Sequence, residues 1–483
     1  MGKYSAVVLG GGISGLTTAY YLSRMGRKVA LVESSNRLGG WVRTIRNPDG
    51  INYEVGPRSV RPVGSTANAT CLLLEDLGLE NEVTFVKKTE PAARVRMILL
   101  DKQLVELPAN ISSLFLPTTA FGKPLIATLM GELFKKRPDP ALEDDSLYNF
   151  ATRHFGSKIA DNGIDPLIRG ITAGDCREIS VSSLMAPLFE GEKTHGSVVK
   201  AMLANSLSSS NTKIDRQSME WSKIFATAQA RKWAIYSLKP GLETITERLT
   251  DELRKRDCKI YSNSKANSID FKMNGKAVVD LGFEKLEANH VFAAIPAYSL
   301  GPLIEKSKVP RGIASFLKSV PFVDVAVVNL EYRGQDVLNG RKAFGYLVPS
   351  HQRYCSVLGV SFDTCSFPQK DRVILTVMMG GKWFDELFGT NCNDPEIFFS
   401  TARREVQERL GITRSPERYF VSVLRKCIPQ HVIGHKAKLL RCRKEIERSN
   451  LPLTLVGASY DGISINDCVH YAKAAALSTN LSS

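Results

Sequence analysis

The sequence predicts an α/β protein that combines a nucleotide-binding domain with a second, strand-rich domain. Three observations lead to this expectation. A strand, a glycine-rich turn and a helix follow one another near the N-terminus, residues 323–379 are rich in strand-like runs, and a second strand-turn-helix unit occupies residues 453–477. The 483 residues, 43% of them apolar, suffice for roughly two to four domains with buried cores.

The composition excludes several classes of protein. Glycine and proline, at 36 and 22 residues, are too few for a collagen-like or low-complexity chain, and no uninterrupted apolar run reaches the roughly 18 residues of a membrane-spanning helix. The nine cysteines are dispersed without a CxxC pair, which predicts reduced, mostly buried thiols rather than a disulfide framework or a zinc site. The net charge of +15 fits an anionic membrane surface or an anionic substrate. Nucleic acid is not an expected partner, because the basic residues are scattered and no recognition motif accompanies them.

The first informative element is a short apolar strand at residues 4–9 that leads into Gly10, Gly12 and Gly15 in a GxGxxG pattern. A helix and a second strand follow and end at Glu33, which completes a βαβ unit. In such a unit the glycines allow a tight turn, the approach of a pyrophosphate and close helix–strand packing, and the carboxylate binds a ribose diol. We therefore interpret the segment as a Rossmann-type dinucleotide-binding unit; a purely structural glycine-rich turn is the alternative.

A basic residue and a glycine pair follow Glu33. Residues 37–41 read Arg-Leu-Gly-Gly-Trp, and the resulting E-x-x-x-R-x-G-G pattern resembles that of the flavin-containing amine oxidase and phytoene desaturase superfamily. This resemblance implies FAD rather than NAD as the cofactor. Gly56, Pro57 and Arg58 form a rigid turn that would hold a guanidinium near the cofactor, with a surface salt bridge as the alternative for Arg58.

The middle of the chain is less decisive. Apolar residues between Leu125 and Phe134 fall on one helical face, and Lys135, Lys136 and Arg137 follow them. This pattern predicts either a core-facing helix or an amphipathic element on an anionic bilayer. The polar residues 205–212 predict a loop, and the strand-like runs of 323–379 predict a large antiparallel sheet.

The last element is the strand at 453–456, which is followed by a glycine turn and a helix that begins near residue 465. We predict a second cofactor contact here, because a helix N-terminus directed at a flavin would stabilise the negative charge of the reduced ring. An ordinary strand-loop-helix that closes the sheet is the alternative.

From end to end, the chain resembles the protoporphyrinogen oxidase family of animal mitochondria. The resemblance is carried by motifs at residues 8–16, 31–35, 37–41, 56–58, 293–297, 325–330, 345–349, 427–430 and 453–460. It implies a discontinuous FAD-binding domain of para-hydroxybenzoate-hydroxylase type over 1–88, 226–300 and 430–483, an α+β substrate-binding domain over 89–100 and 301–429, and a helical membrane-binding domain over 101–225.

The resemblance also implies an activity. Non-covalent FAD would oxidise protoporphyrinogen IX to protoporphyrin IX in three two-electron steps, with O2 as acceptor and release of H2O2, in haem biosynthesis. The implied protein is a homodimer bound peripherally to the inner mitochondrial membrane on its intermembrane-space side. Because the flavin carries the chemistry, neither a catalytic side chain nor a metal is expected. An FAD-dependent amine oxidase is the alternative activity, and a binding protein on a degenerate flavin fold is a second alternative.

The motifs and the resemblance together give the candidate site residues. Those expected to bind substrate are Arg96, Ala173, Phe344, Leu347 and Met378, with Arg96 paired to a propionate and Arg94 as the alternative for that role. Those expected to bind the cofactor are Gly10, Gly11, Gly12, Ile13, Ser14, Gly15, Glu33, Ser34, Arg37, Gly40, Trp41, Gly56, Pro57, Arg58, Ser59, Ala266, Gly457, Gly462, Ile463, Ser464 and Ile465. The chain departs from the family at Tyr346, where the family commonly has histidine.

Overall fold

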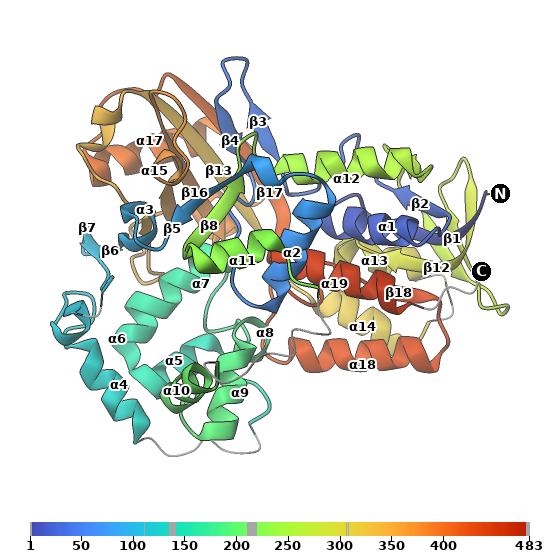
Figure 1. Cartoon of the computed structure of the whole chain (residues 1–483), viewed down its shortest axis with the longest axis horizontal. Helices are drawn as coiled ribbons and strands as arrows, with labels where there is room; N and C mark the ends of the chain where they lie inside the picture. The colour runs from blue at the N-terminus through green and yellow to red at the C-terminus, as the bar shows by residue number, and fades with distance from the viewer. Residues whose placement is uncertain are drawn as a thin grey trace. The chain divides into compact units, whose positions relative to one another are not determined.

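The computed structural model describes residues 2–110, 112–134, 142–209, 220–305, 307 and 309–479 (Figure 1). The chain divides into two compact units, each built from separate segments. The first unit comprises Met1–Thr84, Trp221–Pro321 and His435–Ser483, and the second comprises Phe85–Glu220 and Phe322–Gly434. The expected substrate-binding and membrane-binding domains both fall mainly in the second unit, and their separation from each other stays a prediction.

The first unit is built on a sheet whose strand order is β10-β11-β12-β1-β2-β9, with β18 also paired to β12. Its strands are β1 (Gly2–Leu9), β2 (Val29–Val32), β9 (Lys259–Tyr261), β10 (Ser268–Phe271), β11 (Ala277–Asp280), β12 (Lys285–Ala293) and β18 (Leu453–Leu455). The pairs that join β1, β2, β9, β12 and β18 to one another are parallel, as a nucleotide-binding domain requires, whereas β11 pairs with β12 and β10 in antiparallel fashion. This arrangement confirms the predicted βαβ unit.

Helices pack around this sheet. Its long helices are α1 (Ile13–Arg24), α2 (Ser65–Asp76), α12 (Glu243–Lys255), α14 (Arg311–Ser319), α18 (His435–Arg448) and α19 (Ile465–Ser478). Helix α1 contacts α12 and α19, and α19 also contacts α2. The smaller elements of the first unit are β3 (Thr44–Arg46), β4 (Asn52–Glu54), η1 (Glu80–Glu82), α11 (Lys223–Ala230), β8 (Trp233–Leu238) and α13 (Ala297–Ile304), and β5 (Val83–Lys87) crosses the division between the units.

The second unit contains the predicted large sheet, with strand order β17-β13-β16-β15-β14-β6-β7. Its strands are β6 (Arg96–Leu100), β7 (Gln103–Glu106), β13 (Phe322–Arg333), β14 (Gly345–Leu347), β15 (Val357–Phe362), β16 (Arg372–Gly381) and β17 (Arg418–Pro429). All pairs are antiparallel except that of β6 with β14. Helix α17 (Pro395–Leu410) packs its apolar side chains into the main core of this unit, and α7 (Asp165–Thr172) contacts β14 and β15. Shorter helices are α3 (Pro91–Arg94), η4 (Gln335–Leu338), α15 (Asp363–Ser366) and α16 (Phe384–Phe388).

The rest of the second unit is helical. It consists of η2 (Ser112–Phe115), α4 (Leu125–Leu133), α5 (Leu147–Phe155), α6 (Ser157–Ile159), η3 (Ala160–Ile164), α8 (Val181–Leu184), α9 (Ala186–His195) and α10 (Val198–Ser209). Helix α4 confirms the predicted helix, while Lys135, Lys136 and Arg137 lie outside the described residues.

The predicted loop over residues 205–212 is wrong for 205–209, which continue α10, and 210–212 lie outside the described residues. The N-terminus of α10 explains the difference. The carboxylate of Glu132 accepts hydrogen bonds from the N–H groups of Val198 and Val199 at 2.8 and 3.1 Å, and such an anchored helix tolerates serines in its last turn.

All nine cysteines are free thiols; seven of them are buried, as their dispersed positions predicted for most of them, and Cys365 and Cys392 are half-buried. Within the described ranges, no helix is long and apolar enough to cross a bilayer.

Candidate active site

The glycine-rich turn between β1 and α1 contains glycines of two kinds. A Cβ added to Gly10 would lie 2.6 Å from the Ala294 carbonyl oxygen, and one added to Gly15 would lie 1.8 Å from the Gly10 carbonyl oxygen. The packing of the chain therefore requires both. Gly12 has an ordinary extended backbone, with φ of −73°, and its Cβ would meet only the Gly40 Cα, at 3.9 Å. Packing does not explain Gly12, whereas the close approach of a ligand does.

The groups around Gly12 suit a dinucleotide. No side chain caps the N-terminus of α1, so the helix presents its N–H groups and positive dipole end at the turn. At the end of β2, the Glu33 carboxylate accepts hydrogen bonds from the N–H groups of Gly11 at 2.8 Å and Ser35 at 2.7 Å, and from the Ser34 hydroxyl at 3.3 Å. These bonds fix a carboxylate beside the turn, where a ribose diol binds in this fold.

Two further motifs meet the turn. The Gly39 N–H donates to the Gly11 carbonyl at 2.7 Å, and a Cβ on Gly40 would lie 3.0 Å from the Gly12 Cα. A Cβ on Gly56 would lie 1.8 Å from the Trp41 carbonyl oxygen. Three segments that the sequence separates by up to about 44 residues therefore form one surface, and this surface fits the pyrophosphate end of FAD.

Arg37 has a different environment from the one we expected. Its guanidinium donates to the Glu243 carboxylate at 2.8 Å, to the Leu38 carbonyl at 2.8 Å and to the Gly40 carbonyl. These bonds fix the loop that contains the glycine pair, so Arg37 supports the conformation of the proposed cofactor surface. Its direct contact with the cofactor stays a prediction.

Segments from other parts of the first unit reach the same surface. The Ser264 N–H donates to the Glu33 carbonyl at 2.8 Å. Ala266 follows Ser264 by two residues, so this bond brings its segment next to the end of β2. The Asn466 side chain donates to the Arg61 carbonyl at 2.8 Å, which ties α19 to the half-buried segment of Pro57, Arg58 and Ser59.

The loop after β18 closes the site from the C-terminal side. Gly457 has φ of +112°, and a Cβ there would lie 3.4 Å from the Ser14 Oγ at the start of α1. The following residues, Gly462, Ile463, Ser464 and Ile465, lead into α19.

The N-terminus of α19 contains a feature that the sequence interpretation missed. Ser464 and Asp467 form a capping box, in which the Ser464 Oγ accepts from the Asp467 N–H at 3.1 Å and donates to the Asp467 carboxylate at 2.6 Å. The Ser-x-x-Asp spacing was the available signal. The carboxylate partly offsets the positive helix end that we expected to face a reduced flavin.

Three of the expected substrate residues come together in the second unit. Leu347 on β14 pairs with Gly359 on β15, which pairs in turn with Met378 on β16. Paired residues share one face of a sheet, so the half-buried side chains of Leu347 and Met378 lie on the same face. A Cβ on Gly359 would lie 2.9 Å from the Leu347 Cδ2, so the Leu347 side chain lies over this glycine. The C-terminal turn of α7 covers this face: a Cβ on Gly170 would lie 2.6 Å from the Leu347 Cδ2, and Ala173 packs in one apolar cluster with Met378.

The other two expected substrate residues, Arg96 and Phe344, lie where β6 and β14 of the same sheet are paired. The Arg96 guanidinium lies 6.0 Å from the centre of the Phe344 ring, and β6 and β14 run side by side there. Arg96 and Arg94 are both exposed. Tyr346 points into the core, where its hydroxyl donates to the Glu405 carboxylate at 2.9 Å, so the departure from the family pattern lies on the face away from Leu347.

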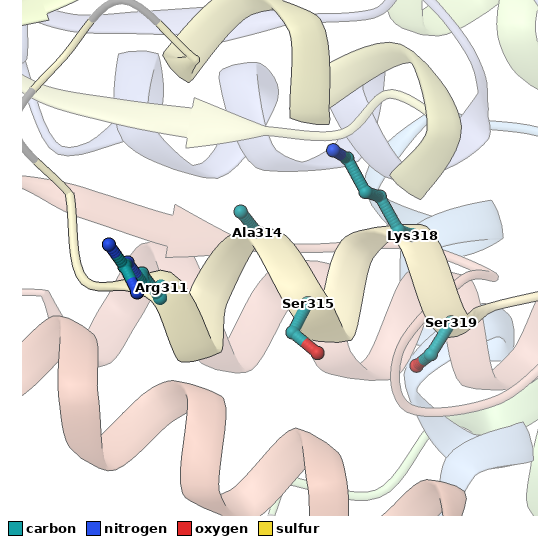
Figure 2. A pocket seen from close by; sticks show the side chains of 5 residues that line it. All are labelled: Arg311, Ala314, Ser315, Lys318 and Ser319. Atoms are coloured by element: carbon teal, nitrogen blue, oxygen red, sulfur yellow. The ribbon is translucent and has the colours of Figure 1, made fainter.

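A separate hollow of about 470 Å³ lies along α14 in the first unit (Figure 2). It is lined by Arg311, Ala314, Ser315, Lys318 and Ser319, and it contains none of the candidate residues. The candidate site is therefore defined by the convergence of motifs and not by this surface hollow.

Comparisons with known proteins agree with this geometry. The model of the flavin containing amine oxidoreductase family matches residues 13–477. The chain is 37% identical to human protoporphyrinogen oxidase over 99% of its own length and 98% of the human chain, and 30% identical to the Schizosaccharomyces pombe protoporphyrinogen oxidase over 96% of each chain. Among solved structures, a candidate protoporphyrinogen oxidase from Exiguobacterium sp. 255-15 shares the fold, with a TM-score of 0.79, 22% identity and coverage of 99% and 98% of the two chains. The chain belongs to the flavin-containing amine oxidoreductases and, within them, to the protoporphyrinogen oxidase family.

Proposed function

We propose that this protein oxidises protoporphyrinogen IX to protoporphyrin IX with FAD as cofactor and O2 as electron acceptor. The observation that carries the cofactor assignment is Gly12, whose missing side chain is explained by a bound dinucleotide and not by the packing of the chain. Family membership over nearly the whole chain supports the substrate.

The stoichiometry follows from the change in oxidation state. Each porphyrinogen loses six electrons and six protons, so three O2 molecules become three H2O2. When FAD is bound, it supplies the two-electron chemistry. The residues of the chain bind and orient the ligands. Glu33 and the turn at Gly12 hold the dinucleotide, and the half-buried side chains of Leu347 and Met378, beside the C-terminal turn of α7, form an apolar wall for a flat macrocycle. Arg96 supplies a permanent positive charge for a propionate.

We also propose peripheral attachment to a membrane through the helical part of the second unit. Helix α4 contacts both η2 and α10, and large apolar side chains are exposed in or next to these three elements. These are Phe115, Leu116, Met130, Phe134, Met202 and Leu203, which we call the apolar patch; Phe134 is 83% exposed. A patch of this kind beside a net charge of +15 suits an anionic bilayer.

The inner mitochondrial membrane, on its intermembrane-space side, and a homodimeric assembly complete the proposal. Both come from the family resemblance. Fractionation of mitochondria with alkaline extraction tests the first, and light scattering of the purified protein tests the second.

The activity is tested by adding protoporphyrinogen IX to the purified yellow protein in air. We expect porphyrin fluorescence to rise faster than in a blank without enzyme, with one H2O2 per O2 consumed. A flavin-containing protein that does not accelerate the reaction but oxidises primary amines would contradict the proposal in favour of an amine oxidase.

A further inference from the structure

The turn that ends α7 has an unusual backbone. Ala173 adopts a left-handed conformation with φ of 52° and ψ of 20°. This conformation is disfavoured for any residue with a Cβ, and it persists where the surrounding structure enforces it. Ala173 belongs to the face that also contains Leu347 and Met378, so what enforces its conformation bears on the proposed substrate wall.

Three hydrogen bonds hold the turn. The Ala173 N–H donates to the Arg169 carbonyl at 2.9 Å, and the Lys382 N–H donates to the Ala173 carbonyl at 2.9 Å. The buried amide of Gln430 donates to the Thr172 carbonyl at 2.9 Å. A Cβ on Gly174 would lie 1.9 Å from the Gln430 Oε1, which shows how closely this side chain abuts the turn.

Arg169, one turn earlier on α7, connects the same elements through its side chain. It is 4% exposed, its Nη1 donates to the Val348 carbonyl at 2.8 Å, and its guanidinium lies 4.7 Å from the centre of the Trp383 ring. Val348 follows Leu347, and Trp383 follows Lys382. The guanidinium therefore contacts both the segment that follows Leu347 and the segment that holds the Ala173 carbonyl.

The charge of Arg169 is costly where it lies. Burial lowers its pKa, and the nearby Asp165 and Asp175 carboxylates and Cys355 compensate only in part. Among the described residues, Asp165 and Asp175 form ion pairs with Arg177 and not with Arg169, and the Arg169 Nε has no hydrogen-bond partner. Replacement of such a buried charge by an apolar side chain is often neutral or stabilising, so the hydrogen bond to Val348 and the contact with Trp383 are the features that require arginine here.

We propose that Arg169 and Gln430 are positioning residues for the substrate. They fix the turn of Thr172, Ala173 and Gly174 beside Leu347 and Met378, and so set the position of the apolar side chains that would contact the tetrapyrrole. This inference rests on the proposed function. It predicts an effect on substrate affinity that is larger than any effect on the chemical step.

The test compares Arg169→Lys with Arg372→Lys in the flavin-loaded protein. Arg372 is a matched control, because it is a half-buried arginine of the same unit, paired to Glu331 at the opposite end of β16 from Met378. We expect Arg169→Lys to raise KM for protoporphyrinogen IX by about tenfold, to change kcat by less than about threefold and to weaken protoporphyrin IX binding in a fluorescence titration in step with KM. The control should retain both values, and the flavin spectra should be unchanged.

Each outcome decides the inference. A folded, flavin-loaded Arg169→Lys protein with unchanged KM and porphyrin affinity would overturn it, as would an equal effect in Arg372→Lys. If the wild-type protein does not oxidise porphyrinogen, the proposed function is wrong, and the porphyrin titration still tests the role of Arg169. If the wild-type protein shows neither turnover nor porphyrin binding, the proposed function and the inference about Arg169 are both wrong. Should Arg169→Lys not fold, Gln430→Met, which removes the donor to Thr172, is judged by the same values.

Discussion

At the scale of single residues, Gly12 separates cofactor binding from folding. Valine at this position has an accessible backbone conformation, and the nearest protein atom to its Cβ is the Gly40 Cα at 3.9 Å. Its methyl groups would fill the space in front of the turn. We therefore expect Gly12→Val to fold, with wild-type circular dichroism, and to be purified without flavin absorbance.

Gly15→Ala is the control for that prediction. Its Cβ would lie 1.8 Å from the Gly10 carbonyl oxygen, between β1 and α1, where neither backbone can yield cheaply. We expect a loss of more than about 4 kcal/mol of stability, measured by denaturant unfolding, with loss of flavin as a consequence. A Gly12→Val protein that keeps its flavin, or a stable Gly15→Ala protein, would contradict our interpretation of the turn.

Arg96 offers a second prediction at this scale. It is exposed beside Phe344, so replacing it by alanine should leave the fold intact. If it binds a propionate equally in the ground and transition states, Arg96→Ala raises KM about tenfold with little change in kcat. Initial rates against protoporphyrinogen IX concentration measure both. The reverse result, a normal KM in Arg96→Ala and a raised one in Arg94→Ala, would move the propionate contact to Arg94.

At the scale of elements, a buried carboxylate joins α4 to α5 and α10. Burial tends to raise the pKa of Glu132, but hydrogen bonds from Ser197, Val198 and Val199 and from the His154 ring outweigh it, so the pKa is lowered. A carboxyl group whose pKa is lower in the folded state stabilises the protein at pH values above its unfolded-state pKa. This contribution is lost as the pH falls through the folded-state pKa. We therefore expect the midpoint temperature of thermal unfolding to decrease as the pH is lowered below about 4.5. Glu132→Gln should cost about 1–3 kcal/mol at neutral pH and flatten this dependence, and parallel pH curves for the two proteins would contradict the role of Glu132.

The same elements show which features a sequence can predict. The βαβ unit and α4 follow from patterns within one element or two adjacent ones, since periodicity and turn chemistry are local. The turn at Ala173 does not, because its partner Gln430 lies 258 residues further along the chain. The length of α10 was missed for the same reason, since its anchor is a glutamate 66 residues earlier. The glycines of the cofactor surface were predictable by motif, but the contact of Gly40 with Gly12 and that of Gly56 with Trp41 appear only in the fold.

At the scale of the whole molecule, the net charge and the exposed apolar side chains predict membrane binding with different salt dependence. The net charge of +15 should attract anionic vesicles in a manner that salt screens, whereas burial of the apolar patch should persist at high salt. We expect the protein to float with phosphatidylglycerol-containing vesicles at both low and high salt. The double variant Met130→Ser/Phe134→Ser, which removes two exposed side chains of α4 and its end, should float at low salt only. Met273→Ser/Phe283→Ser is the matched control, because these side chains are also exposed but lie in the first unit, outside the patch. Flotation of both double variants at high salt would show that Met130 and Phe134 are not needed for salt-resistant attachment and would contradict the role of the patch. Loss of flotation at high salt in the wild-type protein would leave charge alone to account for attachment.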